Sequence, residues 1–144
     1  MNNLFTKSLT RRIYYFGTVF FFLLFLVLTY DTIKTLPERD HHENFTPQVV
    51  LGKGVWEKNA CIGCHTLLGE GAYYAPELSN VYERRGAEFI KAWIKSRPSN
   101  PTNTSGRRQM PQFNLTEEEI DALTAFLKWI SNLSTANWPP NIEG

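Results

Sequence analysis

One pentapeptide, Cys61-Ile62-Gly63-Cys64-His65, constrains the fold of this chain of 144 residues more than any other stretch. Two cysteines separated by two residues and followed at once by histidine form the C-x-x-C-H pattern to which c-type haem is attached. In that pattern each thiol adds to a vinyl group of the haem, and the histidine is held under the iron as an axial ligand. We therefore predict one covalent haem c on Cys61 and Cys64, with His65 as an iron ligand.

A C-x-x-C spacing is also found in disulfides, thioredoxin-like redox pairs and zinc sites. The sequence has no cysteine besides these two, and zinc would need further cysteine or histidine ligands at suitable spacing. The adjacent His41 and His42 supply no closed ligand set, and we expect them to be solvated. The histidine after Cys64 and a methionine further along the chain favour haem over the other three sites.

An uncharged segment, IYYFGTVFFFLLFLVLTY, extends from Ile13 to Tyr30. As a helix that rises ~1.5 Å per residue it would span roughly 27 Å, close to the ~30 Å of a bilayer's hydrocarbon core. A cleaved signal peptide is the rival interpretation, but the segment is long and bulky, and no small-x-small cleavage site follows it. We therefore predict an uncleaved, single-pass membrane anchor.

The charges around this segment predict its orientation. Lys7, Arg11 and Arg12 precede it without any acidic residue, which places residues 1–12 in the cytoplasm by the positive-inside rule. The rest of the chain then lies on the periplasmic side of a bacterial inner membrane, where covalent haem attachment is expected.

Lysine and arginine (15) nearly balance aspartate and glutamate (14) over the whole chain, so no nucleic-acid partner is indicated.

Met110 is the candidate for the second axial ligand of the iron. The only other methionine, Met1, lies on the far side of the predicted membrane anchor. Met110 ends a loop rich in Pro, Asn, Ser and Thr and is followed by the rigid Pro111; the alternative is a gap-filling core side chain. Ligation by histidine and methionine leaves no open position for substrate, so such a chain would carry electrons and perform no bond chemistry.

Capping signals predict the first and last helices of the globular part. Thr46 would be the N-cap and Pro47 the first residue of a helix that runs into the haem motif. Thr116 and Glu119 form a capping box at the start of the last helix. That helix presents one apolar face, which consists of Ile120, Leu123, Phe126, Leu127 and Ile130.

Gly52 and Trp56 share one face of the first of these helices, where the glycine would let the last helix approach closely. The arrangement resembles the N-terminal helix of class I cytochromes c, except that four residues rather than three separate Trp56 from Cys61. Another helix is predicted after Gly86. Its apolar positions are expected to form core that walls the haem: Phe89, Ile90, Trp93 and Ile94.

These signals predict an all-α fold, with one N-terminal transmembrane helix and a class I cytochrome c-like helical domain around one covalent haem c. Residues 1–12 would be the cytoplasmic N-terminus, 13–30 the anchor, 31–46 an irregular periplasmic linker, 47–133 the cytochrome c domain and 134–144 a C-terminal tail. Trp138 in the tail is expected either to dock on a partner or to pack on its own domain.

Three stretches carry a resemblance to a known family: the N-terminal anchor, CIGCHTLLGEGAYYAPELSNVYERRG and RRQMPQFNLTEEEIDALTAFLKWIS. They cover most of residues 10–133 and resemble the small, membrane-anchored cytochrome c component of bacterial nitric oxide reductase. The resemblance implies a subunit that takes electrons from a soluble periplasmic cytochrome c or cupredoxin. It would pass them to haem b of a large catalytic membrane subunit, where a haem and a non-haem iron reduce nitric oxide during denitrification.

The resemblance also implies roles for individual residues. Cys61 and Cys64 would form the thioethers, His65 would be the proximal ligand and Met110 the distal one. Pro76 matches a proline whose carbonyl oxygen accepts a hydrogen bond from the ligand histidine in class I cytochromes. Such a bond fixes the tautomer of the imidazole and raises its basicity.

The family further has a calcium ion near the haem propionates, at the interface between the subunits. In this chain Gly71 and Tyr73 are the candidate ligands. Apart from the resemblance, the sequence supports calcium only in that glycines let the backbone bend and that calcium binds carbonyl oxygens. Packing of Tyr73 and Tyr74 on the haem, or hydrogen bonds to its propionates, is the alternative.

A free-standing, membrane-anchored monohaem cytochrome that shuttles electrons to terminal oxidases is the alternative function. The anchor contains a single glycine, Gly17, and no small-xxx-small face, so its pattern shows no obvious surface for packing on a partner helix. The two functions differ in one measurable property, which is whether the chain is isolated with a second haem protein.

Overall fold

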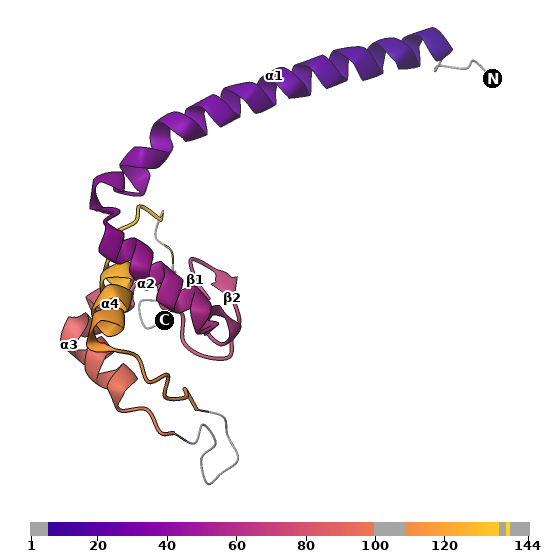
Figure 1. Ribbon diagram of the computed structural model, residues 1–144. Helices are drawn as coiled ribbons and strands as arrows, with labels where there is room; N and C mark the ends of the chain where they lie inside the picture. Colours follow the sequence, from indigo (N-terminus) through magenta and orange to yellow (C-terminus); the bar gives the residue numbers. More distant parts are fainter. Residues whose placement is uncertain (1–5, 100–108, 136–137, 139–144) are drawn as a thin grey trace. The chain divides into compact units, whose positions relative to one another are not determined.

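The computed structural model describes residues 6–99, 109–135 and 138 (Figure 1). Part of the predicted loop before Met110 and most of the tail therefore lie outside the described residues. The elements within them are α1 (Lys7–Arg39), α2 (Pro47–Lys58), β1 (Thr66–Leu67), β2 (Glu70–Gly71), α3 (Val81–Lys95) and α4 (Glu117–Ser131), with 3-10 turns at His42–Asn44 and Cys61–Gly63. The predicted all-α class is confirmed, and the chain forms two compact units, Met1–Glu38 and Arg39–Gly144.

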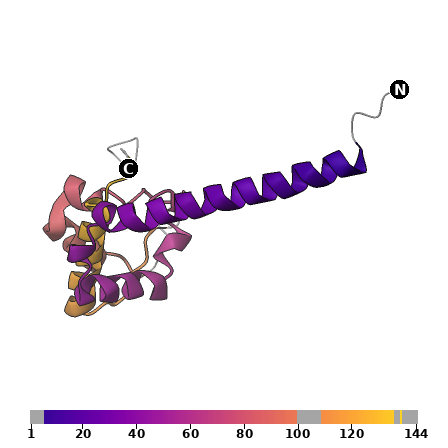
Figure 2. The ribbon, with the colours of Figure 1, turned by 90° about the horizontal axis from the view of Figure 1, so that it is seen from above.

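Helix α1 runs unbroken from Lys7 to Arg39, as Figure 2 shows. Its 33 residues correspond to roughly 50 Å at ~1.5 Å per residue, which exceeds the ~30 Å of a bilayer core. None of its residues is buried. It is the one helix among the described residues that is long and apolar enough to cross a membrane.

The helix continues past the predicted end of the anchor. Residues 31–39, which we expected to be irregular linker, are helical and include Pro37. Extending an existing helix costs far less free energy than starting a new one, so a polar segment without apolar periodicity can still propagate it. Outside α-helix, the predicted linker is reduced to residues 40–46, which contain the short 3-10 turn.

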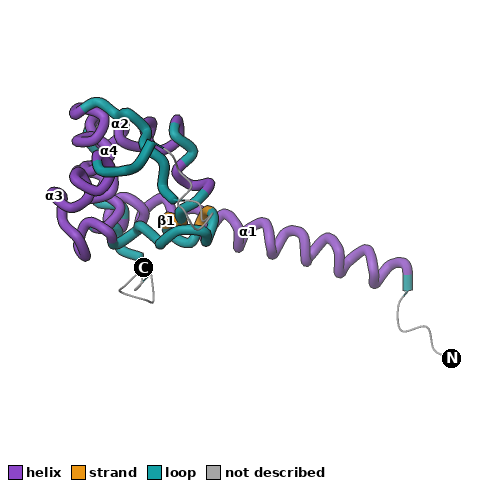
Figure 3. Tube along the Cα trace, turned by 90° about the horizontal axis from the view of Figure 1, so that it is seen from below, coloured by secondary structure: helices purple, strands orange, loops and turns teal. Residues whose placement is uncertain are grey.

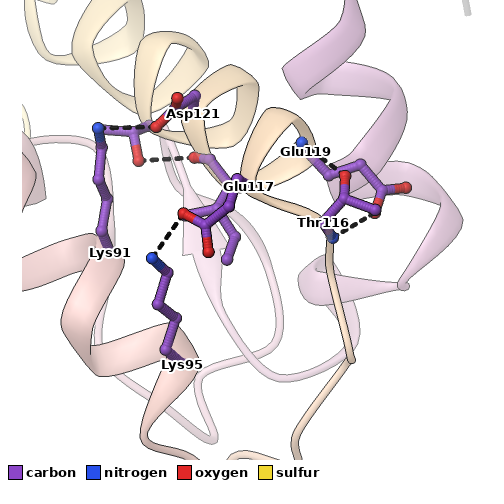
Figure 4. A network of polar contacts seen from close by, with 8 residues as sticks. Lys91, Lys95, Thr116, Glu117, Glu119 and Asp121 are labelled. Carbon is purple, nitrogen blue, oxygen red and sulfur yellow. Dashed lines mark hydrogen bonds and ion pairs between the residues drawn. The ribbon is translucent and has the colours of Figure 1, made fainter.

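Both predicted capping signals are present in the structure. The side chain of Thr46 accepts a hydrogen bond from the amide of Val49 at 3.3 Å, and Pro47 begins α2. At the start of α4, Thr116 Oγ1 accepts from the Glu119 amide at 3.2 Å, and Glu119 Oε2 accepts from the Thr116 amide at 2.9 Å (Figure 4). The two caps fix where the crossing helices of the domain begin.

Helix α2 crosses α4, and the figures show them in contact from two directions (Figures 1 and 3). Gly52 lies at the crossing and Trp56 packs on Phe126 with ring centroids 6.3 Å apart. The apolar face predicted for α4 is buried in full. The core consists of Val49, Val55, Trp56, Val81, Ile90, Ile94, Ile120, Leu123, Phe126, Leu127 and Ile130.

Helix α3 contains a break at Gly86, whose backbone is not helical (φ 75°, ψ 167°). The predicted helix after Gly86 is therefore confirmed, and a short helical turn from Val81 precedes it. Ile90 and Ile94 face the core, with 5% and 7% of their surfaces exposed. Lys91 forms an ion pair with Asp121 of α4 at 2.7 Å, and Lys95 forms one with Glu117 at 2.6 Å (Figure 4). These ion pairs add polar contacts between α3 and α4 beside the apolar ones.

The prediction that Phe89 and Trp93 are core residues was wrong. Their side chains are 44% and 45% exposed. Residues 89 and 93 form one row of the helix and residues 90 and 94 the next, and only the second row faces α4. The exposed rings stack on each other at 5.6 Å, and Arg85 and Arg97 lie over their outer faces at 5.4 and 3.5 Å.

Candidate haem attachment site

The haem motif forms a tight turn directly after helix α2. Ala60 has a left-handed backbone (φ 50°), and the 3-10 turn Cys61–Gly63 follows it. The amides of Cys64 and His65 both donate to the carbonyl oxygen of Cys61, at 3.1 and 3.0 Å. Both cysteines are partly exposed on this one turn, and they do not form a disulfide with each other.

The environment of Cys61 argues against a thioredoxin-like redox pair. Burial raises the pKa of its thiol to about 11, a backbone hydrogen bond acts in the opposite direction, and the neighbouring Cys64 adds to the increase. Reactive cysteines of redox pairs have a lowered pKa, because the thiolate is the nucleophile. The Cys61 thiol of the folded chain is instead protonated at neutral pH.

The ring of His65 is oriented by a single backbone group. Its Nδ1 lies 2.7 Å from the carbonyl oxygen of Pro76, which can only accept, so Nδ1 carries the proton and donates. Burial lowers the pKa of His65, and the bond to Pro76 acts to raise it. The imidazole is therefore neutral at neutral pH, with Nε2 left as the nitrogen that can bind a metal. Trp56 flanks the ring, with centroids 6.4 Å apart.

A small hairpin follows the histidine. Strand β1 pairs with β2 in antiparallel register, Thr66 opposite Gly71. The two residues between the strands, Leu68 and Gly69, both have positive φ (54° and 81°), as a type I′ turn requires. A Cβ atom on Gly71 would overlap the carbonyl oxygen of His65, so only glycine fits at that position.

Sequence reasoning missed a buried carboxylate beside this hairpin. Glu77 is 7% exposed, and its side chain accepts hydrogen bonds from the amides of Leu68 and Ser79, at 3.1 and 2.8 Å, and from the Ser79 hydroxyl. The Ser79 carbonyl in turn accepts from the hydroxyl of Ser131 on α4, at 2.8 Å. A lone glutamate in a loop gives no sequence signal of burial, since most glutamates are exposed.

Met110 is partly buried and packs against the apolar core. The base of the loop that carries it is closed by two bonds. The Gln112 amide donates to the Pro98 carbonyl at 3.3 Å, and the Ser99 hydroxyl donates to Gln112 Oε1 at 3.1 Å. Met110 is therefore held at the domain surface in contact with apolar groups, which is compatible both with an axial ligand and with a core residue.

The residues present fit a covalent haem. They comprise two separate thiols on one turn, a neutral imidazole with Nε2 available, and a partly buried thioether. Thr66, directly after the histidine, is fully buried, and its Oγ1 has no hydrogen-bond partner among the described residues. A buried hydroxyl without a partner is uncommon in a completed site and is expected where a bound group supplies the missing contact.

The candidate calcium ligands lie on the same hairpin. Gly71 ends β2, and Tyr73 is 74% exposed, with its hydroxyl donating to the Gly69 carbonyl at 3.4 Å. Within the described part of the chain, no group of three or more His, Cys, Asp and Glu side chains could hold a metal ion. Among the described residues, this hairpin therefore offers a cation only single side-chain groups and backbone carbonyls.

Trp138 lies beside this hairpin rather than away from the domain. A Cβ atom on Gly69 would be 3.5 Å from its ring. The ring is 40% exposed, and the Thr135 hydroxyl donates to the Trp138 carbonyl at 2.7 Å. Of the two expectations for this side chain, the structure supports packing on its own domain.

Comparison with known proteins agrees with this geometry. Residues 49–131 match the family model described as cytochrome c. The C subunit of nitric oxide reductase from Stutzerimonas stutzeri is 55% identical over 149 residues, which cover 100% of both chains. The corresponding C subunit from Paracoccus denitrificans is 47% identical over 153 residues, again 100% of both chains.

The C subunit of nitric oxide reductase from Halomonas halodenitrificans is 45% identical over 148 residues, which cover 96% of this chain and 97% of the relative. These similarities include the anchor helix as well as the haem motif, because the aligned region covers nearly the whole of each chain. The chain therefore belongs to the family of nitric oxide reductase C subunits, and its residues 49–131 form a cytochrome c domain.

Proposed function

We propose that this chain is the electron-transfer subunit of a membrane nitric oxide reductase complex and that it contains no catalytic site of its own. One observation carries the proposal: the Pro76 carbonyl oxygen, 2.7 Å from His65 Nδ1, orients the His65 ring. This histidine directly follows Cys61 and Cys64, which share one turn and form no disulfide. That arrangement prepares one covalent haem with one fixed axial ligand. Once the haem is bound, both thiols and the imidazole are engaged by it and are not left to act as nucleophile or base.

In this proposal Cys61 and Cys64 hold the haem by thioether bonds, and His65 and Met110 are the axial ligands of the iron. Bound in this way, haem c supplies a one-electron iron(III)/iron(II) couple with a raised reduction potential. The two protein ligands exclude substrate from the iron. Trp56, which packs on Phe126 of α4, lies beside one side of the His65 ring.

The proposal places the chain in the inner membrane, with residues 1–12 cytoplasmic, 13–30 within the bilayer and the cytochrome c domain, residues 47–133, in the periplasm. Lys7, Arg11 and Arg12 at one end of α1 support this orientation. Residues 31–46 would connect the two parts. Since α1 continues to Arg39, much of that connection is helical.

The proposed partners follow from the family. The chain would accept electrons from a soluble periplasmic cytochrome c or cupredoxin and deliver them to haem b of a large catalytic subunit, which reduces nitric oxide at a haem and non-haem iron site. The full-length similarity to C subunits of nitric oxide reductase supports this assembly over a free-standing shuttle for terminal oxidases.

A calcium ion at the interface with the catalytic subunit is part of the same proposal, with Gly71 and Tyr73 as ligands. The hairpin supports it in one respect: the Tyr73 hydroxyl and the Gly69 carbonyl oxygen already lie 3.4 Å apart, next to Gly71. Calcium accepts such neutral oxygens when carboxylates complete the shell. Removal of calcium with a chelator should weaken the association of the two subunits, and Tyr73→Phe should have the same effect.

The experiment that tests the proposal is purification of the tagged chain from its native membranes in a mild detergent, followed by measurement of haem c, haem b and the polypeptides present. We expect one haem c per chain and a co-purifying large subunit that contains haem b. Isolation of the chain alone, at full haem c occupancy, would support the free-standing shuttle instead. A Met1–Tyr30 deletion, expressed with a cleavable signal peptide, tests whether the anchor is needed for the association.

A further inference from the structure

The carboxylate of Glu77 is the only charged side chain that is buried among the described residues. It directly follows Pro76, whose carbonyl oxygen accepts the hydrogen bond of His65. We propose that Glu77 is a positioning residue for the axial histidine, which fixes the Pro76 carbonyl at His65 Nδ1 and thereby sets the reduction potential of the bound haem. The inference rests on the proposed ligation of the iron by His65.

Both oxygens of the Glu77 carboxylate are used within the loop. Oε1 accepts from the Ser79 hydroxyl and, at 3.1 Å, from the Leu68 amide, which also donates to Ser79 Oγ at 2.6 Å; Oε2 accepts from the Ser79 amide at 2.8 Å. Hydrogen bonds to a charged acceptor are stronger than neutral ones, and they offset the cost of burying the carboxylate. The side chain therefore joins the hairpin after His65 to the segment that precedes α3.

The segment around Pro76 is held from both sides. The Ala75 amide donates to the Cys64 carbonyl at 2.8 Å, and the Leu78 amide donates to the Thr66 carbonyl at 3.0 Å. Arg84 Nη2 donates to the backbone carbonyl of Glu77 at 2.8 Å. Within this segment, the peptide between Pro76 and Glu77 is the one that presents its carbonyl to the histidine.

The Pro76 carbonyl lies in one peptide plane with the amide nitrogen and Cα atom of Glu77, so anchoring Glu77 by its carboxylate restricts rotation of that plane, in addition to the backbone bonds of the segment. If the carboxylate of Glu77 is released, that plane can rotate and the bond to His65 lengthens. A weaker bond lowers the basicity of the imidazole, which is raised by a hydrogen bond to a carbonyl. A less basic ligand stabilises iron(III) less, so the reduction potential rises.

The test uses the full-length, haem-loaded protein in detergent and three variants. Glu77→Gln removes the charge and one acceptor position. Ser79→Ala leaves the charge and removes the hydroxyl that donates to Glu77 and accepts from the Leu68 amide at 2.6 Å. Glu83→Gln is the control. Glu83 lies in the first turn of α3, so its substitution makes the same change of charge outside the network. The measurements are the reduction potential and the solvent exchange rate of the His65 ring N–H by NMR.

We expect a higher potential and faster N–H exchange in both Glu77→Gln and Ser79→Ala, with exchange faster by about tenfold, as loss of the hydrogen bond from His65 to the Pro76 carbonyl implies. Glu83→Gln should match the wild type in exchange rate. If Glu77→Gln does not take up haem, Ser79→Ala alone carries the test, because it keeps the carboxylate.

Three results would count against the inference. Unchanged exchange and potential in both network variants, with a wild-type ligand spectrum, overturn the positioning role and leave the proposed function intact. A rise in potential in Glu77→Gln but not in Ser79→Ala, with unchanged exchange in both, indicates loss of charge alone and also overturns it. Absence of histidine ligation in the wild-type spectrum refutes instead the ligand assignment of the proposed function.

Discussion

Gly52 lies against the backbone of Ala122 so closely that a Cβ atom on Gly52 would overlap the Ala122 carbonyl oxygen. It would also lie 2.8 Å from the Cβ atom of Phe126. Helices α2 and α4 thus cross at backbone contact. Because Trp56 packs on both Phe126 and His65, at 6.3 and 6.4 Å between ring centroids, the crossing also positions one wall of the haem site.

Replacement of Gly52 by alanine should therefore destabilise the domain. We expect Gly52→Ala to lower the free energy of unfolding by about 3 kcal/mol, because the helices must separate to admit the methyl group. The matched control is Gly54→Ala, which lies in the same helix with nothing within 4 Å of its added Cβ. That variant should be neutral or more stable by up to ~1 kcal/mol, since alanine is the better helix former. Denaturant titration of the haem-loaded proteins measures both, and equal losses would refute the close crossing.

Met110 should control the reduction potential of the bound haem. We expect Met110→Leu, which keeps the apolar volume, to lose the sulfur-to-iron absorption band of the oxidised protein. Its potential should fall by on the order of 0.1 V or more, since axial ligands span a range of ~0.8 V. Retention of the band and of the potential would show that Met110 is only a core residue. Leu115→Ala is the packing control, because that side chain also lies against the core.

The two rows of helix α3 should respond differently to truncation. Ile90→Ala removes a buried side chain, and we expect the free energy of unfolding to fall by about 2–5 kcal/mol, as is typical of buried isoleucine. Phe89→Ala removes a ring that is 44% exposed and should cost less than about 1.5 kcal/mol, mainly lost stacking on Trp93. Denaturant titration compares them. Equal costs would mean that both rows are buried in the folded protein.

The capping box of α4 should make stability depend on pH. The backbone bond from Thr116 lowers the pKa of Glu119 below its usual value of 4.5, and the nearby Lys58 contributes in the same direction. A carboxyl with a lowered folded-state pKa stabilises the fold fully above its unfolded pKa, and that contribution is lost as pH falls through the folded value. The stability difference between wild type and Glu119→Gln should therefore shrink as pH falls below the usual pKa of 4.5. A difference that is constant with pH would exclude the charged cap.

Thr116→Ala tests the other half of the same cap. Loss of its hydroxyl leaves the Glu119 amide without its acceptor at 3.2 Å, and we expect a cost of about 1 kcal/mol. Thr135→Ala is the control: its hydroxyl bonds only the exposed Trp138 carbonyl, at 2.7 Å, so its loss should cost less than the loss of the cap. A neutral result for Thr116→Ala would mean that water replaces the cap.

Much of this fold could be predicted because its signals are local. The caps at Thr46 and Thr116, the break at Gly86 and the crossing at Gly52 each depend on a residue type that one backbone position demands. The C-x-x-C-H motif is equally local, since its five residues occupy one turn.

The features that were mispredicted or missed depend on how neighbouring segments pack on or extend one another, which no single residue type shows. Phe89 and Ile90 are both strongly apolar, and only the position of α4 decides which of them is buried. Burial of Glu77 depends on amides from Leu68 and Ser79, which no spacing rule identifies. The helical state of residues 31–39 depends on the long apolar helix before them, which supplies the nucleus that their own sequence lacks.

The central claim is that electrons reach the catalytic subunit through the haem of this chain. Stopped-flow mixing of the intact complex with a reduced soluble donor, followed at the absorption bands of haem c and haem b, tests it most directly. We predict that haem c is reduced first and haem b afterwards, and that Met110→Leu slows the reduction of haem b while the complex stays assembled. Reduction of haem b at the same rate in a complex that lacks a working haem c would contradict the claim.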